Sequence, residues 1–304
     1  MKLITYTQGA GPRPGLVVGE NLVLDLLAAD PSLLPNWHGL LPRLDTVRAI
    51  CDRLQPAATK AAAVLAGGGE VSLPFVDLRR CALTTPIILP SKIIAVGLNY
   101  KDHAAEQNKP LPERPLLFSK ASTCLQVPGG PIELPEGLDQ VDAEAEIAFV
   151  ISKPGRAIAR ERAREHIAGY MCFNDISDRE AQYSDKQFFR GKSLDTGGPC
   201  GPWLVTPDEL PDLGLGLRIR CLWNDVVMQE SNTNQLIFTP DFLVSYISRH
   251  MTLLPGDIIT TGTPGGVGVF RDPPVFLKPG DRVTVEIDGL GTLSNPVRRW
   301  RAPA

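Results

Sequence analysis

The stretch DAEAEIAFVI, residues 142–151, constrains the fold of this chain more than any other segment. Its β-branched and aromatic residues predict a strand, in which residues two apart share a face. Asp142, Glu144 and Glu146 therefore share one face, which continues with Ala148 and Val150, while the opposite face is apolar throughout. Such a strand is buried on both faces, so the segment predicts a sheet that is covered on both sides.

The three acids of this strand leave alternatives open. A buried carboxylate needs a proton, a cationic partner or a metal ion, because burying a bare charge costs several kcal/mol or more. A polar strand edge that faces solvent explains the acids equally well. The strand pattern alone does not decide between an exposed edge and a metal site.

The rest of the chain divides into two parts with different patterns. Residues 1–88 combine short antiparallel strand patterns with one helical stretch at 44–67. Residues 89–304 are mainly β, because β-branched runs separated by Gly and Pro recur at 92–100, 144–152, 169–177, 217–228, 257–263 and 281–297. We therefore expect an α+β fold, mainly β, with a small N-terminal domain (1–88) and a larger domain (89–304).

Charge and composition exclude several classes of partner. The net charge of −3 argues against nucleic acid or an anionic membrane as a partner. No run approaches the roughly 18 apolar residues that span a bilayer, and no signal-peptide core precedes the first Gly and Pro, so we expect a cytoplasmic protein. The six cysteines are scattered without a C-x-x-C pair, which favours free thiols over disulfides or a zinc site.

A fourth acid follows a second apolar strand pattern. Asp175 comes where GYMCFN gives way to the helix-like SDREAQ, a position typical of an N-cap or turn residue and also of an active-site group. If Asp175 joined Glu144 and Glu146, the three would form an all-oxygen site. Mg²⁺ and Mn²⁺ are the natural ions for such a site.

A histidine and an acid stand three residues apart in GLNYKDHAAEQN (97–108). His103 and Glu106 share a face if this stretch is helical. A carboxylate beside an imidazole fixes its tautomer and raises its basicity, as activation of a water requires, although a surface His–Glu pair has the same spacing. The Pro-rich EQNKPLPERP that follows is typical of a mobile lid.

Two glycine-containing segments were tested against nucleotide-binding motifs. RGKS (190–193) lacks the glycine that a phosphate-binding loop requires at position 186, which is Lys186, and TGTPGGVG (261–268) is not a dinucleotide fingerprint. Lys192 can still serve as a fixed cation for an anionic substrate. The second segment is by itself a tight turn, although its glycines allow close approach to a ligand and Thr261 and Thr263 offer hydroxyls.

The order of these motifs is more specific than any one of them. G-x-N-Y-x-x-H-x-x-E, E-x-E, N-D-x-S-x-R-x-x-Q, G-K-S-x-D-T-x-x-P-x-G-P-W and T-G-T-P-x-G-V-G follow one another between about residues 90 and 297. Together they resemble the fumarylacetoacetate hydrolase superfamily. The likeness is greatest to its smaller branch of acylpyruvases, fumarylpyruvate hydrolases, diketo-deoxy-sugar-acid hydrolases and oxaloacetate decarboxylases. It implies a mixed β-roll with a small N-terminal α+β domain, and a homodimer.

The resemblance also implies a metal site and a catalytic dyad. It makes Glu144, Glu146 and Asp175 the ligands of Mg²⁺ or Mn²⁺, with Asp142 left out. It makes His103 and Glu106 a water-activating dyad on a lid that orders over the substrate.

Further residues are implied to contact the substrate. Lys192 and Gln182 would meet its polar groups or its developing negative charge, and Thr263, with Gly262 beside it, would lie against its carboxylate. One departure from the family pattern is Ala143, where many members carry an aromatic residue before E-x-E.

The chemistry expected from this resemblance is the cleavage of a C–C bond in a 2,4-dioxo acid of the acylpyruvate or fumarylpyruvate type. The metal ion would stabilise the enolate that leaves, and His103 would deprotonate the attacking water. Two alternatives are decarboxylation of oxaloacetate and isomerisation or decarboxylation of a 2-hydroxy-dienoate at the same site. A third is a non-catalytic binder of small oxo acids.

Overall fold

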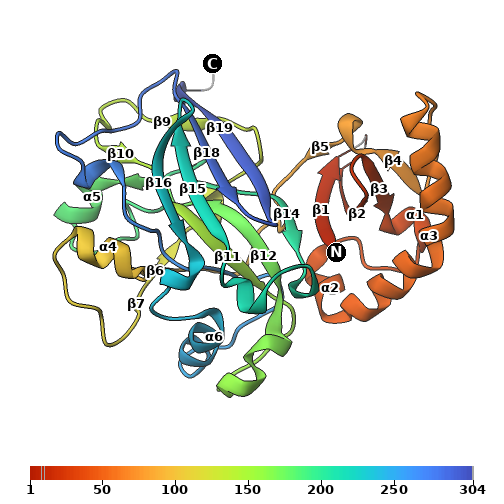
Figure 1. Ribbon diagram of the computed structural model, residues 1–304, viewed down its shortest axis with the longest axis horizontal. Coiled ribbons are helices and arrows are strands. Elements are labelled where there is room, and N and C mark those ends of the chain that lie inside the picture. The colour runs from red at the N-terminus through yellow and green to blue at the C-terminus, as the bar shows by residue number, and fades with distance from the viewer. Residues whose placement is uncertain (8, 10, 303–304) are drawn as a thin grey trace.

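The computed structural model describes residues 1–7, 9 and 11–302, and it consists of two lobes (Figure 1). The smaller lobe holds the N-terminal elements. They are β1 (Lys2–Thr7), β2 (Pro12–Val18), β3 (Leu22–Asp25), α1 (Leu26–Ala29), α2 (Trp37–Leu40), α3 (Leu44–Ala66), β4 (Phe75–Asp77) and β5 (Ala82–Leu83). The helical stretch expected at 44–67 is thus α3, and the antiparallel strands expected before it are β1 to β3.

The larger lobe contains most of the strands and three short helices. Its helices are α4 (Lys101–Glu106), α5 (Arg179–Ser184) and α6 (Pro240–Ser248). Its strands are β6 (Ile93–Gly97), β7 (Leu116–Lys120), β8 (Leu125–Gln126), β9 (Ile132–Leu134), β10 (Val141–Asp142), β11 (Ala145–Ile151), β12 (Ile167–Asn174), β13 (Ser177–Asp178), β14 (Gly198–Val205), β15 (Arg218–Trp223), β16 (Val226–Asn232), β17 (Ile258–Thr260), β18 (Arg282–Ile287) and β19 (Gly291–Arg299). Short 3₁₀ helices lie at Leu41–Arg43, Leu78–Arg80, Ser122–Cys124, Arg160–His166, Pro207–Glu209, Asp212–Gly214, Thr233–Gln235 and Gly268–Phe270.

A twelve-stranded sheet runs through both lobes in the order β4-β3-β2-β1-β14-β12-β11-β17-β6-β7, with β5 and β8 paired at its sides. The lobes join where β1 pairs antiparallel with β14, Lys2 opposite Val205. A second sheet has the order β16-β15-β18-β19-β9, and β10 and β13 form a separate pair. Most pairings are antiparallel, but β17 pairs parallel with β6. The fold is therefore α+β and mainly β, as expected, while the domain boundary at residue 88 stays a prediction.

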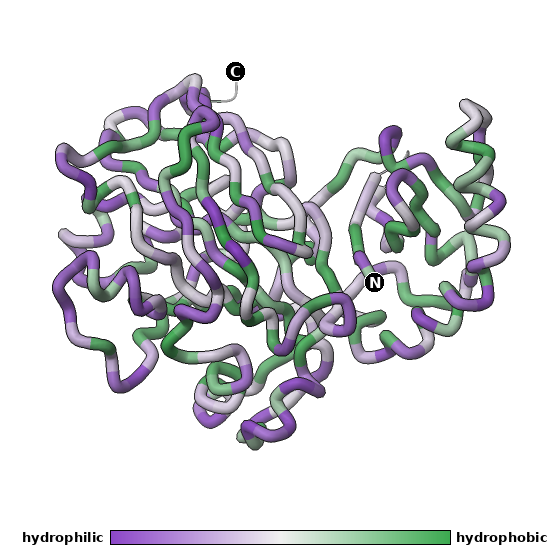
Figure 2. Tube along the Cα trace, viewed as in Figure 1, coloured by the Kyte–Doolittle hydropathy of each residue, from purple (hydrophilic) through white to green (hydrophobic). Residues whose placement is uncertain are grey.

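The strand predicted over 142–151 is interrupted, because Asp142 ends β10, residues 143 and 144 belong to no strand, and β11 begins at Ala145. Strand β11 itself is covered on both faces, as its sequence predicts. It lies between β12 and β17, and every one of its residues is buried. Ile147 and Phe149 pack in the core shared with the second sheet, whereas Ala148 and Val150 pack in the core shared with the N-terminal lobe. Figure 2 accordingly shows hydrophobic residues along the central strands and hydrophilic ones along the outer loops.

The segment 106–115 is expected to be a loop; its first residue, Glu106, ends α4, and residues 107–115 form no helix or strand. Within the described residues, no helix combines the length and the apolar character needed to cross a bilayer.

Candidate metal centre and its cavity

Three buried carboxylates meet where β11 begins and β12 ends. Glu146 lies in β11, Glu144 lies just before it, and Asp175 follows β12 directly. The antiparallel register that pairs Ala145 with Asn174 brings these positions together, and the Asp175 N–H donates to the Glu144 carbonyl over 2.9 Å. One oxygen from each carboxylate can be chosen so that all lie within 4.8 Å of one another. The structure thus groups the three acids for which the sequence predicts a shared role.

Two of these acids are already paired with buried cations. The Lys192 Nζ donates to Glu144 Oε2 over 2.7 Å and to Asp175 Oδ2 over 2.8 Å. The Lys120 Nζ donates to Asp175 Oδ1 over 2.6 Å, and the Arg179 Nη1 donates to Glu144 Oε1 over 2.6 Å. Both oxygens of Glu144 and of Asp175 therefore accept a hydrogen bond from a positive group.

Glu146 has a different environment. Its carboxylate accepts one hydrogen bond among the described residues, from the Gly262 N–H over 2.8 Å, and its side chain meets no cation there. Burial, followed by the charges of Asp175 and Glu144, raises the pKa of Glu146 well above its ordinary value. By contrast, Lys192 and Arg179 outweigh the effect of burial on Glu144 and lower its pKa to about 2.

When all four acids of the centre are ionised, the buried charges do not balance without a further cation. Four buried carboxylates (Asp142, Glu144, Glu146 and Asp175) face three buried cations (Lys120, Arg179 and Lys192), so one negative charge is left over, at Glu146. Clustered carboxylate oxygens are the donors that Mg²⁺ and Mn²⁺ prefer. A divalent ion would change the local balance from −1 to +1, which suits an anionic substrate. The residues present therefore fit such an ion.

Asp142 lies outside this group, as the sequence analysis expects. Its Oδ2 accepts from Arg179 Nε over 3.0 Å and from Arg179 Nη2 over 2.6 Å. Its oxygens also accept from the N–H groups of Gly268 and Val269, over 3.0 and 3.1 Å. Asp142 therefore fixes Arg179 and the loop that follows Thr263.

His103 and Glu106 lie on one face of α4 and contact each other. The His103 Nδ1 is 3.0 Å from Glu106 Oε2, and the other oxygen of Glu106 accepts from the Gly266 N–H over 2.8 Å. These two hydrogen bonds outweigh burial and lower the pKa of Glu106, which keeps it negatively charged. The imidazole is buried, with the Phe270 ring centroid 5.8 Å away. The dyad geometry expected from the spacing is present, while its catalytic role stays a prediction.

A cavity of about 160 Å³ is lined by one of the three acids, Glu144, and by His103 of the dyad. Glu144, Lys192 and Gln182 line it together with His103 and Thr263. Aromatic rings supply much of the remaining wall: Phe118, Tyr183, Phe188 and Phe270. The Gln182 Oε1 accepts from Arg179 Nη1 over 3.0 Å, and its amide NH₂ has no hydrogen-bond partner among the described residues.

Thr263 and Gly262 take different positions. The Thr263 hydroxyl lines the cavity, donates to the Ala145 carbonyl over 2.9 Å and accepts from Gln229 Nε2 over 2.8 Å. Gly262 has φ +89, and a Cβ there would lie 2.8 Å from the Val96 carbonyl oxygen, so a side chain does not fit. Its N–H holds Glu146, and it is not among the cavity-lining residues. Substrate contact by either residue stays a prediction.

Several residues of the centre were missed by sequence reasoning. Lys120 ends the strand pattern LLFSK, Arg179 stands within SDREAQ, and Gln229 bridges Ala145 N–H and Thr263. A lysine that is buried at the end of an apolar strand needs an acidic partner. Once Asp175 is known to be buried, the pattern LLFSK indicates Lys120 as its partner. No local pattern indicates Gln229, because its partners are far away in sequence.

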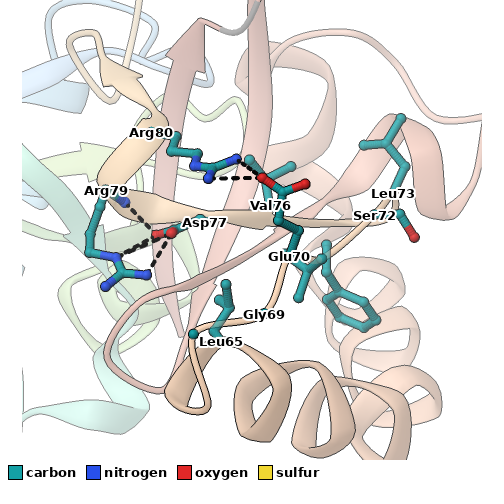
Figure 3. A pocket seen from close by; sticks show the side chains of 12 residues that line it. Leu65, Gly69, Glu70, Ser72, Leu73, Val76, Asp77, Arg79 and Arg80 are labelled. Atoms are coloured by element: carbon teal, nitrogen blue, oxygen red, sulfur yellow. Dashed lines mark hydrogen bonds and ion pairs between the residues drawn. The ribbon is translucent and has the colours of Figure 1, made fainter.

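A second pocket, of about 460 Å³, lies on the N-terminal lobe (Figure 3). Its charged side chains are paired with one another. Arg80 Nη1 lies 3.1 Å from Glu70 Oε1, and Arg79 Nη2 lies 2.7 Å from Asp77 Oδ2. No buried group of acids comparable to the one on β11 lies among its lining residues, so the cavity beside His103 is the better candidate for chemistry.

Comparison with known proteins identifies the family of this chain. The family model of the fumarylacetoacetate (FAA) hydrolase C-terminal domain matches residues 92–298. The mitochondrial oxaloacetate tautomerase fahd2 of Xenopus laevis is 41% identical over 307 residues, which cover 98% of this chain and 90% of that protein.

Two solved structures have the same fold. Maleylpyruvate hydrolase from Sphingobium sp. SYK-6, in complex with manganese(II) and pyruvate, is 30% identical with a TM-score of 0.78. The 2-hydroxyhepta-2,4-diene-1,7-dioate isomerase of Mycobacterium marinum is 31% identical with a TM-score of 0.76. Each alignment covers 99% of this chain and all of the other. The chain belongs to the fumarylacetoacetate hydrolase superfamily, whose related members named here include a tautomerase, a hydrolase and an isomerase.

Proposed function

We propose that this protein is a divalent-metal-dependent enzyme that interconverts the keto and enol forms of oxaloacetate. The observation that carries the proposal is Glu146, a buried acid that contacts no cation among the described residues. It lies beside two paired acids, one of which, Glu144, lines a cavity that His103 also lines. The similarity to an oxaloacetate tautomerase, which extends over 98% of this chain, supports this reaction among those that an enolate-stabilising site can perform.

Glu144, Glu146 and Asp175 would hold Mg²⁺ or Mn²⁺. An ion at this position supplies positive charge beside the carboxylate and keto oxygens of an α-keto acid, where the negative charge of an enolate develops. The aromatic side chains of the cavity wall would lower the local dielectric around a bound substrate, which would strengthen these electrostatic interactions. This ion and these ligands are the ones that the sequence resemblance implies.

His103 would transfer the proton. Its Nε2 removes a proton from C3 of the keto form, and the C2 oxygen gains a proton to give the enol, so no atom is gained or lost overall. Glu106 holds the imidazole through Nδ1 and stabilises its protonated form. Lys192 bonds Glu144 and Asp175 and also lines the cavity, and it would donate a hydrogen bond to the C2 oxygen as the charge of that oxygen grows.

Hydrolysis of a 2,4-dioxo acid is the second candidate, and a specific observation favours it as well. The His103–Glu106 pair has the geometry that activation of a water requires. Maleylpyruvate hydrolase, which shares the fold over its whole length, was solved with manganese and pyruvate. Decarboxylation of oxaloacetate and isomerisation of a 2-hydroxy-dienoate need the same metal and enolate, so one set of assays separates all four.

The test begins with protein stripped by a chelator, to which Mg²⁺ or Mn²⁺ is returned. The decay of the ultraviolet band of enol oxaloacetate measures tautomerisation, and coupled detection of pyruvate measures decarboxylation. A panel of acylpyruvates and a 2-hydroxy-dienoate are assayed in parallel for loss of their own bands.

We expect metal-dependent acceleration of enol decay without a matching release of pyruvate. Pyruvate released from an acylpyruvate at a comparable kcat/KM would instead establish the hydrolase. If the metal-bound protein converts none of these compounds, the result would support a non-catalytic binder of small oxo acids.

A further inference from the structure

Gln107 and Lys109 form a hydrogen-bonded pair at the side of the cavity, and both line it. The Lys109 Nζ lies 2.6 Å from Gln107 Oε1, and the Gln107 Nε2 lies 2.9 Å from His103 Nε2. These contacts continue the dyad in a single line from Lys109 through Gln107 and His103 to Glu106. Sequence reasoning attached no role to either residue.

The direction of each hydrogen bond in this line follows from Lys109. An ammonium only donates, so the atom of Gln107 that it meets is the carbonyl oxygen, and the NH₂ group of the amide faces His103. His103 Nε2 must then be the acceptor, which places the ring proton on Nδ1, where it is donated to Glu106. The lone pair that would act as the base is therefore covered by Gln107.

Lys109 is also the available positive charge of the cavity. Its other lining cations, Arg179 and Lys192, are buried and bonded to acids of the metal centre. The Lys109 ammonium is exposed and forms no ion pair with an acid among the residues the structure describes; its bond is to a neutral amide. Among the described cations that line the cavity, Lys109 is therefore the one that is free to pair with an anionic group of a ligand.

The chemistry of a four-carbon keto diacid requires a cation at this place. Its second carboxylate is bonded to C3, the carbon that loses the proton. Whatever binds that carboxylate must therefore lie directly beside the base. Gln107 touches the base, and Lys109 is one hydrogen bond further away.

We propose that Gln107 and Lys109 are the specificity residues that bind the second carboxylate of the substrate, an inference that rests on the proposed function. In the absence of substrate the pair covers His103. When the keto diacid binds, the Lys109 ammonium leaves Gln107, and the Gln107 NH₂ leaves His103. Both groups then donate to the second carboxylate of the substrate, which uncovers His103 Nε2 next to C3. The enzyme therefore selects a dicarboxylate over an α-keto acid whose far end is uncharged.

Oxaloacetate and its 4-methyl ester make a matched pair of substrates, because they differ at the second carboxylate alone. Enol decay is measured for both with Mn²⁺ in the wild type, Lys109→Ala, Lys109→Arg and Gln107→Ala. A charge-assisted hydrogen bond of this kind corresponds to about a 10- to 100-fold effect. In Lys109→Ala, kcat/KM should fall about 10- to 100-fold for oxaloacetate and less than about 3-fold for the ester. In Lys109→Arg, kcat/KM for oxaloacetate should be close to the wild-type value.

Lys101 provides the control, since it is an exposed lysine on the same helix as His103 and does not line the cavity. Lys101→Ala should leave the kinetics with both substrates unchanged, and thermal unfolding checks that all variants fold. Equal losses on the diacid and the ester, or no loss on either, would overturn the role of Lys109 and Gln107 while leaving the tautomerase intact. Failure of the wild type to accelerate enol decay of either compound would overturn the proposed function together with this inference.

Discussion

Two fully buried carboxylates, one in each lobe, have opposite environments. Asp25 in the N-terminal lobe accepts from the Tyr6 hydroxyl over 2.5 Å, from Arg13 Nε and Nη2 over 2.5 and 2.8 Å, and from the Ala28 N–H over 2.7 Å. Glu146 in the larger lobe accepts from one backbone N–H. Both carboxylate oxygens of Asp25 thus accept hydrogen bonds, whereas Glu146 accepts a single one among the described residues.

The pKa shifts follow the same division. Hydrogen bonds from Arg13, Tyr6 and Ala28 outweigh burial and lower the pKa of Asp25. Burial and two neighbouring carboxylates raise the pKa of Glu146. A buried acid whose partners satisfy it contributes to stability, whereas a buried acid held among other acids indicates a ligand site. The comparison therefore favours a structural role for Asp25, while the role of Glu146 as a metal ligand stays a prediction.

Replacing Glu146 with Gln should have the largest effect. The change keeps the shape of the side chain but removes the charge that a metal ion needs, and several kcal/mol of charge stabilisation in the transition state would be lost with it. Steady-state assays with saturating Mn²⁺ should show a decrease in kcat/KM on the order of 10³-fold or more. The metal-free variant should unfold at the same temperature as the wild type or a higher one, because like-charge repulsion is relieved. Wild-type activity in this variant would remove Glu146 from the site.

Replacing Asp25 with Asn should give the converse result. Loss of a buried charge that Arg13 and Tyr6 depend on should lower the free energy of unfolding by about 3 kcal/mol, at the lower end of the usual range because Arg13 is partly exposed. Activity per folded molecule should not change. Urea unfolding and kcat measurements on the same samples test this, and a loss of turnover in folded Asp25→Asn would break the distinction between the lobes.

The stabilisation from Asp25 should also depend on pH. Because its folded pKa lies below its ordinary value near 3.8, its contribution is complete above that value and is lost as the pH falls through the folded pKa. The difference in unfolding free energy between wild type and Asp25→Asn should therefore be constant from pH 7 to 5 and shrink below about pH 4. Urea titrations at several pH values measure it, and a difference that grows in acid would contradict the assignment.

Metal should stabilise the larger lobe through Glu146. An ion that binds the folded chain alone adds about 2.7 kcal/mol at a hundredfold excess over its Kd. Thermal unfolding of chelator-stripped protein should therefore shift upward with Mg²⁺ or Mn²⁺ in the wild type and in Asp25→Asn, but much less in Glu146→Gln. An equal shift in all three proteins would place the ion elsewhere.

Thr263→Ala should have the smallest effect. The Thr263 hydroxyl already bonds Ala145 and Gln229, so its further contact with a substrate carboxylate is one hydrogen bond, worth about 1 kcal/mol. KM should rise by a few fold, more than kcat falls. If KM is unchanged, Thr263 holds the loop and not the substrate.

The sequence predicted much of this arrangement because its signals are local. Alternation along 142–151 indicates a strand covered on both faces, and the 103–106 spacing places an acid beside the imidazole on one helical face. The order of the motifs identified the superfamily. These features depend on strand and helix periodicity, which neighbouring residues fix.

The remaining features depend on contacts between distant segments. Lys120, Arg179 and Lys192 meet the acids only after three strands and a helix have been brought together, so the imbalance at Glu146 has no sequence signature. The contact between Gln107 Nε2 and His103 Nε2 depends on the orientation of the Gln107 side chain, which the spacing of the two residues in the sequence does not determine. The homodimer, the cytoplasmic location and the choice between Mg²⁺ and Mn²⁺ stay predictions.

The most direct test of the account is the binding of Mn²⁺ to chelator-stripped wild type and Glu146→Gln, followed by electron paramagnetic resonance as free Mn²⁺ disappears. We predict one ion per chain in the wild type and at least a roughly 100-fold weaker Kd in Glu146→Gln, because the ion binds to compensate the charge of this carboxylate. The same affinity in both proteins, or no binding to the wild type, would contradict it.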